Sequence, residues 1–128
     1  MPASVPPVLA EHDAAVAAGG AASMDPEASS AAIDELLFGA VAEVAPGPNT
    51  WTGSVHLHCT DVDGEWLVVA EASRPPVVTR EHAKGACALR GAAADLLLAL
   101  WRRVGLDQID VVGDVDLAAR FVAATELP

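Results

Sequence analysis

Two histidines, His56 and His58, lie two residues apart in a stretch where polar and apolar residues alternate. In an extended strand this spacing places both imidazoles on one face. Two such imidazoles could bind one zinc or copper ion if further ligands came from elsewhere. The nearby side chains that could complete the set are a histidine and three carboxylates: His82, Asp61, Asp63 and Glu65. Because solvent-facing strand surfaces are commonly polar, the sequence favours an exposed histidine pair, and we expect no metal ion.

Residues 61–64 loosely resemble the start of a calcium-binding loop, with Asp61, Asp63 and Gly64 in order. The later ligands and the glutamate at the twelfth loop position do not follow. A hairpin turn explains this segment, and we expect the strands on either side of it to pair.

The two cysteines, Cys59 and Cys87, do not form a CxxC spacing, and we expect free thiols in a reducing cytoplasm. A catalytic thiol needs a nearby base or positive charge to become a thiolate. Cys87 has Lys84, His82 and Arg90 close in sequence, which makes it the better candidate nucleophile. No GxSxG, GxGxxG or P-loop spacing occurs in the sequence.

The helices and strands that must position these residues follow from the apolar periodicity. Asp25 and Pro26 predict the start of a helix. Apolar residues recur at helical spacing from Ile33 to Val44, and the Pro-Gly-Pro sequence at residues 46–48 is expected to end that helix. Alternation predicts strands over 51–59 and 65–70, and shorter strands over 77–80, 85–89 and 109–112 after a break at 74–76. Residues 92–104 predict a helix that Gly105 ends, and Asp114 predicts the cap of a last helix.

This order of elements predicts an α+β fold with a small, mostly antiparallel sheet of four to five strands and helices packed on one side. Residues 1–30 are rich in Ala, Pro, Gly and Ser. We expect a flexible tail or the remnant of an interdomain linker there, with one short Ala-rich helical piece around residues 11–18. Residues 31–128 are expected to form one domain.

The composition limits the expected partners. The sequence has 7 basic and 18 acidic residues, which gives a formal charge of −11. This acidic balance repels phosphate backbones and anionic membranes, so neither nucleic acid nor a membrane is an expected partner. With no apolar run near the roughly 18 residues that a membrane span needs and no secretory signal pattern, the sequence predicts a cytoplasmic location.

Three segments carry a family resemblance: GEWLVVAE, LRGAAADLLLALWRR and VVGDVDLAARFVAATEL, in that order. Together they resemble the C-terminal domain of the mycothiol-dependent maleylpyruvate isomerase family, whose members pair a metal-carrying helical bundle with a small α+β domain. The resemblance covers about residues 33–127 and implies a sterol-carrier-like fold. It also implies that the full-length family uses a divalent metal (zinc) and mycothiol, that a helical-bundle domain or chain is a possible partner, and that a small molecule or thiol is a possible ligand.

The resemblance also suggests a functional arginine. The family places it directly after the tryptophan of the LLLxLW helix, in a pattern similar to Trp101-Arg102-Arg103. Arg103 takes the catalytic position by resemblance, and Trp101, Arg102 and Arg103 together are the expected substrate-binding residues, because a guanidinium binds carboxylates with two parallel hydrogen bonds. Arg102 replaces a small residue, so which arginine points into a cleft stays open. A purely structural role at the helix C-terminus also stays open.

The family's metal ligands do not carry over to this chain. DAAVAAG at residues 13–19 is similar to the end of the last helix of the family's bundle. In that helix the family has a glutamate and a histidine as metal ligands, and the matching positions here are Pro6 and Ala10. Neither side chain binds a metal, so the resemblance implies that this chain lacks the metal site and any cofactor of its own.

The sequence therefore supports three functions. The first is the cleft-forming domain of a mycothiol-dependent, metal-assisted isomerase or thiol transferase that is inactive by itself. The second is a stand-alone small-molecule or lipid-binding module, with an apolar pocket lined by Trp66, Leu97, Leu100 and Phe121. The third is an interaction domain that self-associates through exposed apolar surface.

Overall fold

The protein is described by a computed structural model that covers residues 4–20, 23–43, 51–72 and 74–125. Its five strands are β1 (Gly53–Cys59), β2 (Glu65–Glu71), β3 (Arg74–Thr79), β4 (Cys87–Gly91) and β5 (Asp110–Gly113). They form one sheet in the order β3-β2-β1-β4-β5, in which only β1 and β4 pair in parallel. The predicted α+β fold with a mostly antiparallel sheet is confirmed.

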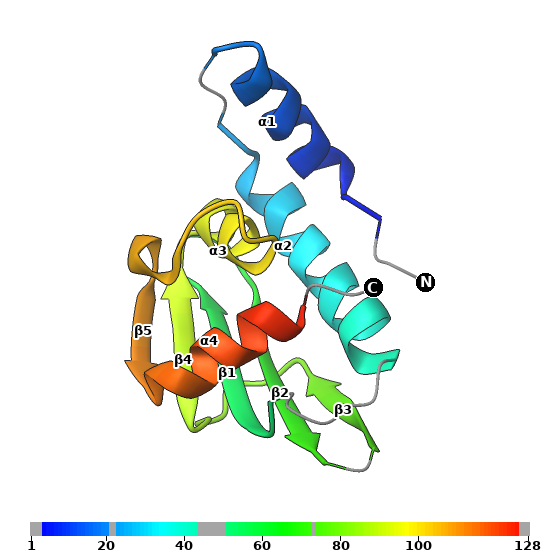
Figure 1. The fold of residues 1–128 in the computed structure, drawn as a ribbon, viewed down its shortest axis with the longest axis vertical. Helices are drawn as coiled ribbons and strands as arrows, with labels where there is room; N and C mark the ends of the chain where they lie inside the picture. Colours follow the sequence, from blue (N-terminus) through cyan, green and yellow to red (C-terminus); the bar gives the residue numbers. More distant parts are fainter. Residues whose placement is uncertain (1–3, 21–22, 44–50, 73, 126–128) are drawn as a thin grey trace.

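The helices are α1 (Pro7–Ala17), α2 (Pro26–Leu36), α3 (Ala93–Leu100) and α4 (Val115–Ala124). A π-helical turn, η1 (Leu37–Val41), continues α2, and a short 3-10 turn, η2 (Leu106–Gln108), precedes β5. Helices α2, α3 and α4 cover one face of the sheet, whereas α1 projects from the rest of the fold (Figure 1). Each helix within the described ranges is too short or too polar to cross a bilayer.

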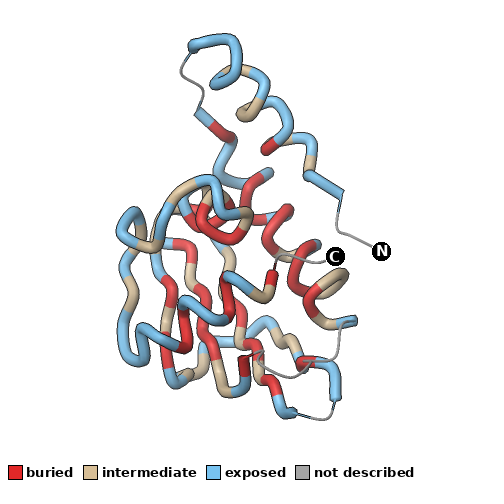
Figure 2. The backbone as a smooth tube through the Cα atoms, in the orientation of Figure 1, coloured by how far each residue is buried: buried red, intermediate tan, exposed pale blue. Residues whose placement is uncertain are grey.

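The hydrophobic core lies between the sheet and these three helices, where the buried segments of strands and helices face one another (Figure 2). Val55 and Leu57 of β1 and Phe121 of α4 are among the side chains that are completely buried there. The alternation predicted for β1 is confirmed, because these apolar positions and Cys59 are buried along one side of the strand. Burial of such side chains is the main contribution to the stability of a domain of this size.

Two predicted helix caps are confirmed. The Asp25 carboxylate accepts a hydrogen bond from the Ala28 N–H at 2.8 Å, and the Asp114 carboxylate accepts one from the Leu117 N–H at 3.1 Å. Each satisfies an N–H group that has no partner within its helix. The predicted helix stop at residues 46–48 lies outside the described residues, as does Val44.

Helix α1 is longer than the Ala-rich piece that the sequence predicted around residues 11–18. It starts at Pro7, a residue type suited to the first helical position. Leu9 on this helix is completely buried and belongs to the hydrophobic core. The sequence pattern missed this contact because one leucine among alanines gives almost no amphipathic signal.

Strand β3 includes the segment that the sequence predicted as a break. It begins at Arg74 and contains Pro75 and Pro76. Because β3 is at the edge of the sheet, one side of it has no neighbouring strand. The pairing of β2 with β3 also shifts register between Val69 and Glu71, so Pro75 and Pro76 lie between the paired residues Arg74 and Val77 and the strand continues without ladder hydrogen bonds from the two prolines.

The prediction that Gly105 ends a long helix is wrong, because α3 ends at Leu100. Arg102 takes the left-handed conformation that commonly ends a helix, with φ of 57°. The turn is closed by the Arg103 N–H, which donates to the Leu98 carbonyl at 2.8 Å. The early end of the helix separates the directions of the two neighbouring arginine side chains.

Asp34 on α2 connects this helix to the segment that follows β3. Its carboxylate accepts hydrogen bonds from the Trp66 indole at 2.8 Å and from the Arg80 guanidinium at 2.7 and 2.8 Å. Arg80 also lies over the Phe38 ring, with 4.0 Å from its central carbon to the ring centroid. The hydrogen bonds from Arg80, and to a smaller extent from Trp66, hold the pKa of Asp34 below its ordinary value, although burial opposes this.

We predict that Asp34→Asn lowers the free energy of unfolding at neutral pH by about 1–2 kcal/mol, because it weakens charged hydrogen bonds at a partly buried position. The Asp34 pKa is lower in the folded chain than its ordinary value of 3.8. Its contribution is therefore fully present above that value and is lost as the pH falls through the folded pKa.

Urea unfolding of both proteins across the acid range should show the difference shrinking below about pH 4. Glu35→Gln is the matched control, because Glu35 is exposed on the same helix, and its effect should stay within about 0.5 kcal/mol. An equal loss for both variants would contradict the assigned role of Asp34.

Candidate functional site

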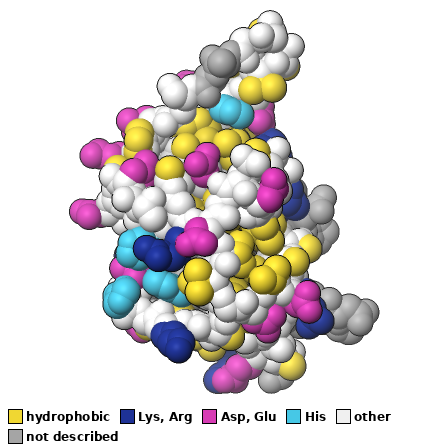
Figure 3. All heavy atoms as spheres, turned by 90° about the vertical axis from the view of Figure 1, so that its left-hand side faces the viewer, with side chains coloured by type: hydrophobic (Ala, Val, Ile, Leu, Met, Phe, Trp, Pro, Cys, Tyr) yellow, Lys and Arg dark blue, Asp and Glu magenta, His cyan; other side chains and the backbone are white. Residues whose placement is uncertain are grey.

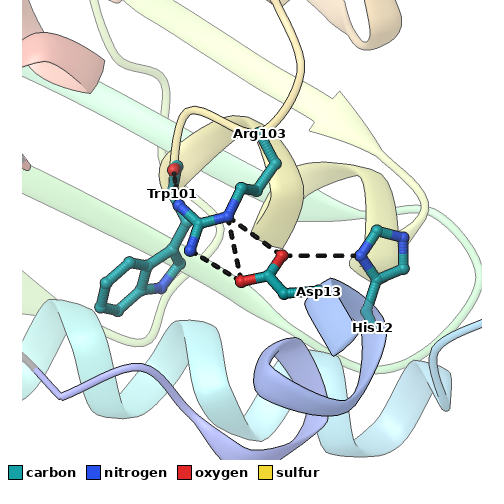
Figure 4. A network of polar contacts seen from close by, with 4 residues as sticks. All are labelled: His12, Asp13, Trp101 and Arg103. Atoms are coloured by element: carbon teal, nitrogen blue, oxygen red, sulfur yellow. Dashed lines mark hydrogen bonds and ion pairs between the residues drawn. The ribbon is translucent and has the colours of Figure 1, made fainter. Parts of the chain in front are cut away.

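The Arg103 side chain turns toward α1 and pairs with Asp13. The Nε atom lies 3.1 and 3.2 Å from the two carboxylate oxygens, and a terminal nitrogen lies 2.8 Å from Oδ2. A second terminal nitrogen donates to the Trp101 carbonyl at 2.8 Å, which keeps the guanidinium beside the end of α3. Figure 4 shows the Asp13 carboxylate between Arg103 and His12, whose Nδ1 atom lies 3.9 Å from Oδ1.

This pair keeps both groups ionised. The hydrogen bond from Arg103 lowers the pKa of Asp13, although burial opposes the shift, and the same hydrogen bond raises the pKa of Arg103. Both side chains remain about one third exposed, at 36% for Arg103 and 35% for Asp13. The guanidinium is therefore accessible and already holds a carboxylate in its bidentate geometry.

Trp101 lies beside this pair and lines a hollow of about 260 Å³. The other walls come from the residues that lead into α1 and from α2 with its π-helical continuation, through residues such as Val5, Ala32, Leu36 and Gly39. The Trp101 indole N–H is buried and has no hydrogen-bond partner among the described residues. A buried donor without a partner costs free energy.

Arg102 points in a different direction from Arg103. Its guanidinium donates to the Leu100 carbonyl at 3.0 Å and to the Thr125 hydroxyl at 2.7 Å. The Thr125 Oγ1 atom also lies 2.8 Å from the Leu100 carbonyl and 2.6 Å from the Val122 carbonyl, so its single proton can be donated to either helix end. Arg102 therefore connects the ends of α3 and α4, whereas Arg103 faces α1.

The family's metal ligand positions do not fit a metal in this chain. Pro6 precedes the first turn of α1, and Ala10 lies within that helix. Neither side chain carries a donor atom, and the neighbouring His12 has its Nδ1 atom directed at Asp13. No step of a reaction can therefore be assigned to a metal ion at this position.

The two thiols do not support nucleophilic chemistry. Cys59 and Cys87 are 4% and 1% exposed, and burial raises the pKa of each thiol to about 11. Both remain protonated at neutral pH, so neither provides a thiolate. The structure gives no support to Cys87 as a nucleophile, because burial and the nearby Asp114 carboxylate both raise the pKa of its thiol.

Three histidines and one glutamate meet on the opposite face of the sheet from the helices. One oxygen of Glu65, Oε2, lies 2.6 Å from Nε2 of His56 and 3.2 Å from Nδ1 of His58, and it also contacts Nδ1 of His82. The four ligand atoms lie within 4.8 Å of one another. The prediction of an exposed histidine pair is wrong for His56, which is only 7% exposed.

Three elements bring this histidine cluster (His56, His58, His82 and Glu65) together. Alternation along β1 places His56 and His58 on one face, and the antiparallel register places Glu65 of β2 directly opposite His58. His82 comes from the segment between β3 and β4, which passes back over the sheet. Histidine side chains gather at one margin of the face drawn in Figure 3, beside basic and acidic side chains.

Glu65 is ionised in this cluster. Burial raises the pKa of its carboxyl, but hydrogen bonding to His82, His56 and His58 outweighs burial and lowers the pKa to about 2. Within the described part of the chain this is the one group of side chains with the spacing of a metal site. All four residues are recognisable as possible ligands in the sequence, but no local pattern shows that His82 returns to the strand.

The side chains expected to line an apolar ligand pocket lie in the core instead. Trp66 is 2% exposed, Leu100 is 1% exposed, and Leu97 and Phe121 are fully buried. They pack with the other core residues between sheet and helices. This packing counts against a lipid cavity at that position.

Residues 27–120 match the family described as MDMPI C-terminal domain. The chain belongs to this family. The abbreviation corresponds to the mycothiol-dependent maleylpyruvate isomerase family that the sequence resembles, so the resemblance is confirmed. None of the curated proteins matches the chain.

Two solved structures have a similar fold. The "Sterol Carrier Protein 2 Like 2" from Aedes aegypti is 23% identical with a TM-score of 0.56, over 76% of this chain and 96% of that one. A protein described as "UbiJ-SCP2 Ubiquinone synthesis protein" is 20% identical with a TM-score of 0.51, over 75% of this chain and 91% of that one. These similarities establish that this MDMPI C-terminal domain has the sterol-carrier-like fold expected from the sequence.

Proposed function

We propose that this MDMPI C-terminal domain is the cleft-forming, anion-binding part of a mycothiol-dependent isomerase or thiol transferase. In this proposal Arg103 binds a carboxylate of the substrate or of the thiol, and Trp101 contributes to the wall of the adjoining hollow. The observation that carries the proposal is the paired geometry of Arg103 with the Asp13 carboxylate.

The surroundings of Arg103 are suited to binding and orienting a small anion. The guanidinium has a planar fork that matches a carboxylate, and it is partly exposed. The hollow beside it has an apolar wall to which Trp101 contributes. Small-molecule sites typically combine such an apolar wall with a few directed polar groups.

Asp13 acts as an internal substitute for the ligand carboxylate in this proposal. It lies on α1, the helix that resembles the end of the family's metal-carrying bundle, and it occupies the fork when no ligand is bound. An incoming carboxylate would displace Asp13 and retain the same charged hydrogen bonds. The role assigned to this chain is binding and positioning, and the chemical step belongs to groups outside it.

We predict that Arg103→Ala weakens binding of a small dicarboxylate by about tenfold, because it removes a bidentate charged contact. Isothermal titration of the chain with maleate and, separately, with mycothiol measures the effect. Asp13→Asn should tighten binding, because it frees the guanidinium from its internal partner. Arg120→Ala is the matched control, since Arg120 is exposed on α4.

The two variants should change the ligand affinity in opposite directions, and this contrast distinguishes ligand binding from a purely structural role of the Arg103–Asp13 pair. If the Arg103–Asp13 pair only holds α1 in place, both variants should lower the melting temperature and neither should tighten binding. A chain that binds neither maleate nor mycothiol, or an Arg103→Ala variant that binds as tightly as Arg120→Ala, would contradict the proposal.

A further inference from the structure

We propose that the histidine cluster is a binding site for one zinc-class divalent transition-metal ion, with three imidazole nitrogens and the Glu65 carboxylate as ligands. This site is separate from Arg103 and does not depend on the function proposed above. It replaces the sequence-based expectation that the chain holds no metal.

The distances within the cluster are close to those of a tetrahedral metal site. Zinc lies about 2.0–2.1 Å from imidazole nitrogen and carboxylate oxygen, so neighbouring ligand atoms in a tetrahedron are about 3.3 Å apart. Here the nitrogens of His56 and His58 lie 2.6 and 3.2 Å from Oε2 of Glu65, and no two ligand atoms are more than 4.8 Å apart. Small side-chain rotations would admit an ion at the centre.

Hydrogen bonding alone does not explain the arrangement well. Three imidazole nitrogens surround the same carboxylate oxygen, but each oxygen of an ionised carboxylate offers about two lone-pair positions. The three rings also stand nearly perpendicular to one another, with centroids 5.6–6.4 Å apart. Lone pairs that converge from different directions on one point are the arrangement that a cation satisfies.

The ligand types indicate the class of metal. Imidazole suits zinc, copper, nickel and iron, whereas magnesium and calcium require mostly oxygen ligands. Three neutral imidazoles and one carboxylate give the site a charge of −1, which partly neutralises a divalent ion. The exposure of His82, at 82% of its side chain, gives an ion access from solvent.

A bound ion would connect three elements of the fold. His56 and His58 belong to β1, Glu65 begins β2, and His82 lies between β3 and β4. The segment around His82 is otherwise held by Arg80, which pairs with Asp34, and by the Ala86 N–H, which donates to the Ser54 hydroxyl at 2.8 Å. Metal binding should therefore raise the stability of the chain and fasten this segment to the sheet.

The test is titration of the metal-free chain with Zn²⁺ in excess Mg²⁺, followed by calorimetry and by ¹H–¹⁵N NMR of the histidine rings. We expect one Zn²⁺ per chain, a higher melting temperature with zinc, and shifted ring signals for His56, His58 and His82. Co²⁺ should give the visible absorption of a tetrahedral site. The signals of His12, the remaining histidine of the sequence, should stay in place.

His82→Ala is the decisive variant, because His82 is exposed and its removal leaves the core intact. We expect it to weaken zinc binding by at least about tenfold and to abolish the zinc-dependent rise in melting temperature. His12→Ala is the matched control and should bind zinc as the unmodified chain does. Zinc binding within about twofold of normal in His82→Ala, or complete competition by Mg²⁺, would overturn the proposal and indicate general attraction to the acidic surface.

Discussion

Replacing Phe121 by alanine is expected to lower the free energy of unfolding by about 3–5 kcal/mol. Phe121 is completely buried on α4, where it packs against the sheet. Its ring meets the Trp51 ring edge to face, with centroids 5.0 Å apart and planes at 83°. Alanine would leave a cavity and remove this aromatic contact, which alone contributes about 0.5–1.5 kcal/mol. Because small domains have only about 5–15 kcal/mol of stability, the loss should be plain in urea unfolding.

Two variants provide controls for this prediction. Phe121→Leu keeps most of the volume and should cost about 1–1.5 kcal/mol. Val115→Ala changes a side chain that is 58% exposed on the same helix, and its effect should stay within about 0.5 kcal/mol. If Phe121→Ala proved as mild as Val115→Ala, α4 could not be packed on the sheet as described.

Replacing Gly113 by alanine is expected to destabilise the chain by about 2–4 kcal/mol. Gly113 has φ of +90°, a conformation that alanine adopts only with strain. A Cβ atom there would lie 2.5 Å from the Ala86 carbonyl oxygen and 3.2 Å from the Cα of Cys87. That oxygen also accepts the Asp114 N–H at 3.0 Å, just before α4 begins. Relief of the contact would therefore disturb the β4–β5 pairing and the start of α4 together.

Gly39→Ala is the matched control, and we expect it to raise the free energy of unfolding instead of lowering it. Gly39 lies in the π-helical continuation of α2, where a Cβ atom would meet nothing within 4 Å. Alanine should stabilise this position by up to about 1 kcal/mol, because it restricts the unfolded chain. Thermal unfolding of both variants measures the contrast, and a stable Gly113→Ala variant would contradict the described junction of β5 and α4.

Much of the fold could be predicted from local sequence patterns. The alternation of Val55, Leu57 and Cys59, the turn before Glu65 and the cap at Asp114 each depend on residues that are close in sequence. The early end of α3 could not be predicted this way. There Arg102 adopts a left-handed conformation, although an arginine normally avoids it and Gly105 follows nearby. In this left-handed conformation the Arg102 side chain donates hydrogen bonds to the Leu100 carbonyl and to Thr125, which lies outside the local sequence pattern.

The sequence by itself determined the family, the α+β class and the identity of the polar residues that could act. It did so because periodicity, caps and family motifs are properties of neighbouring residues. Only the tertiary structure decided which of these residues meet. Arg103 and Asp13 are 90 positions apart, and His82 reaches Glu65 across 17 positions. Contacts over such separations depend on how the packed elements direct the chain, and side-chain packing rather than local preference sets that direction.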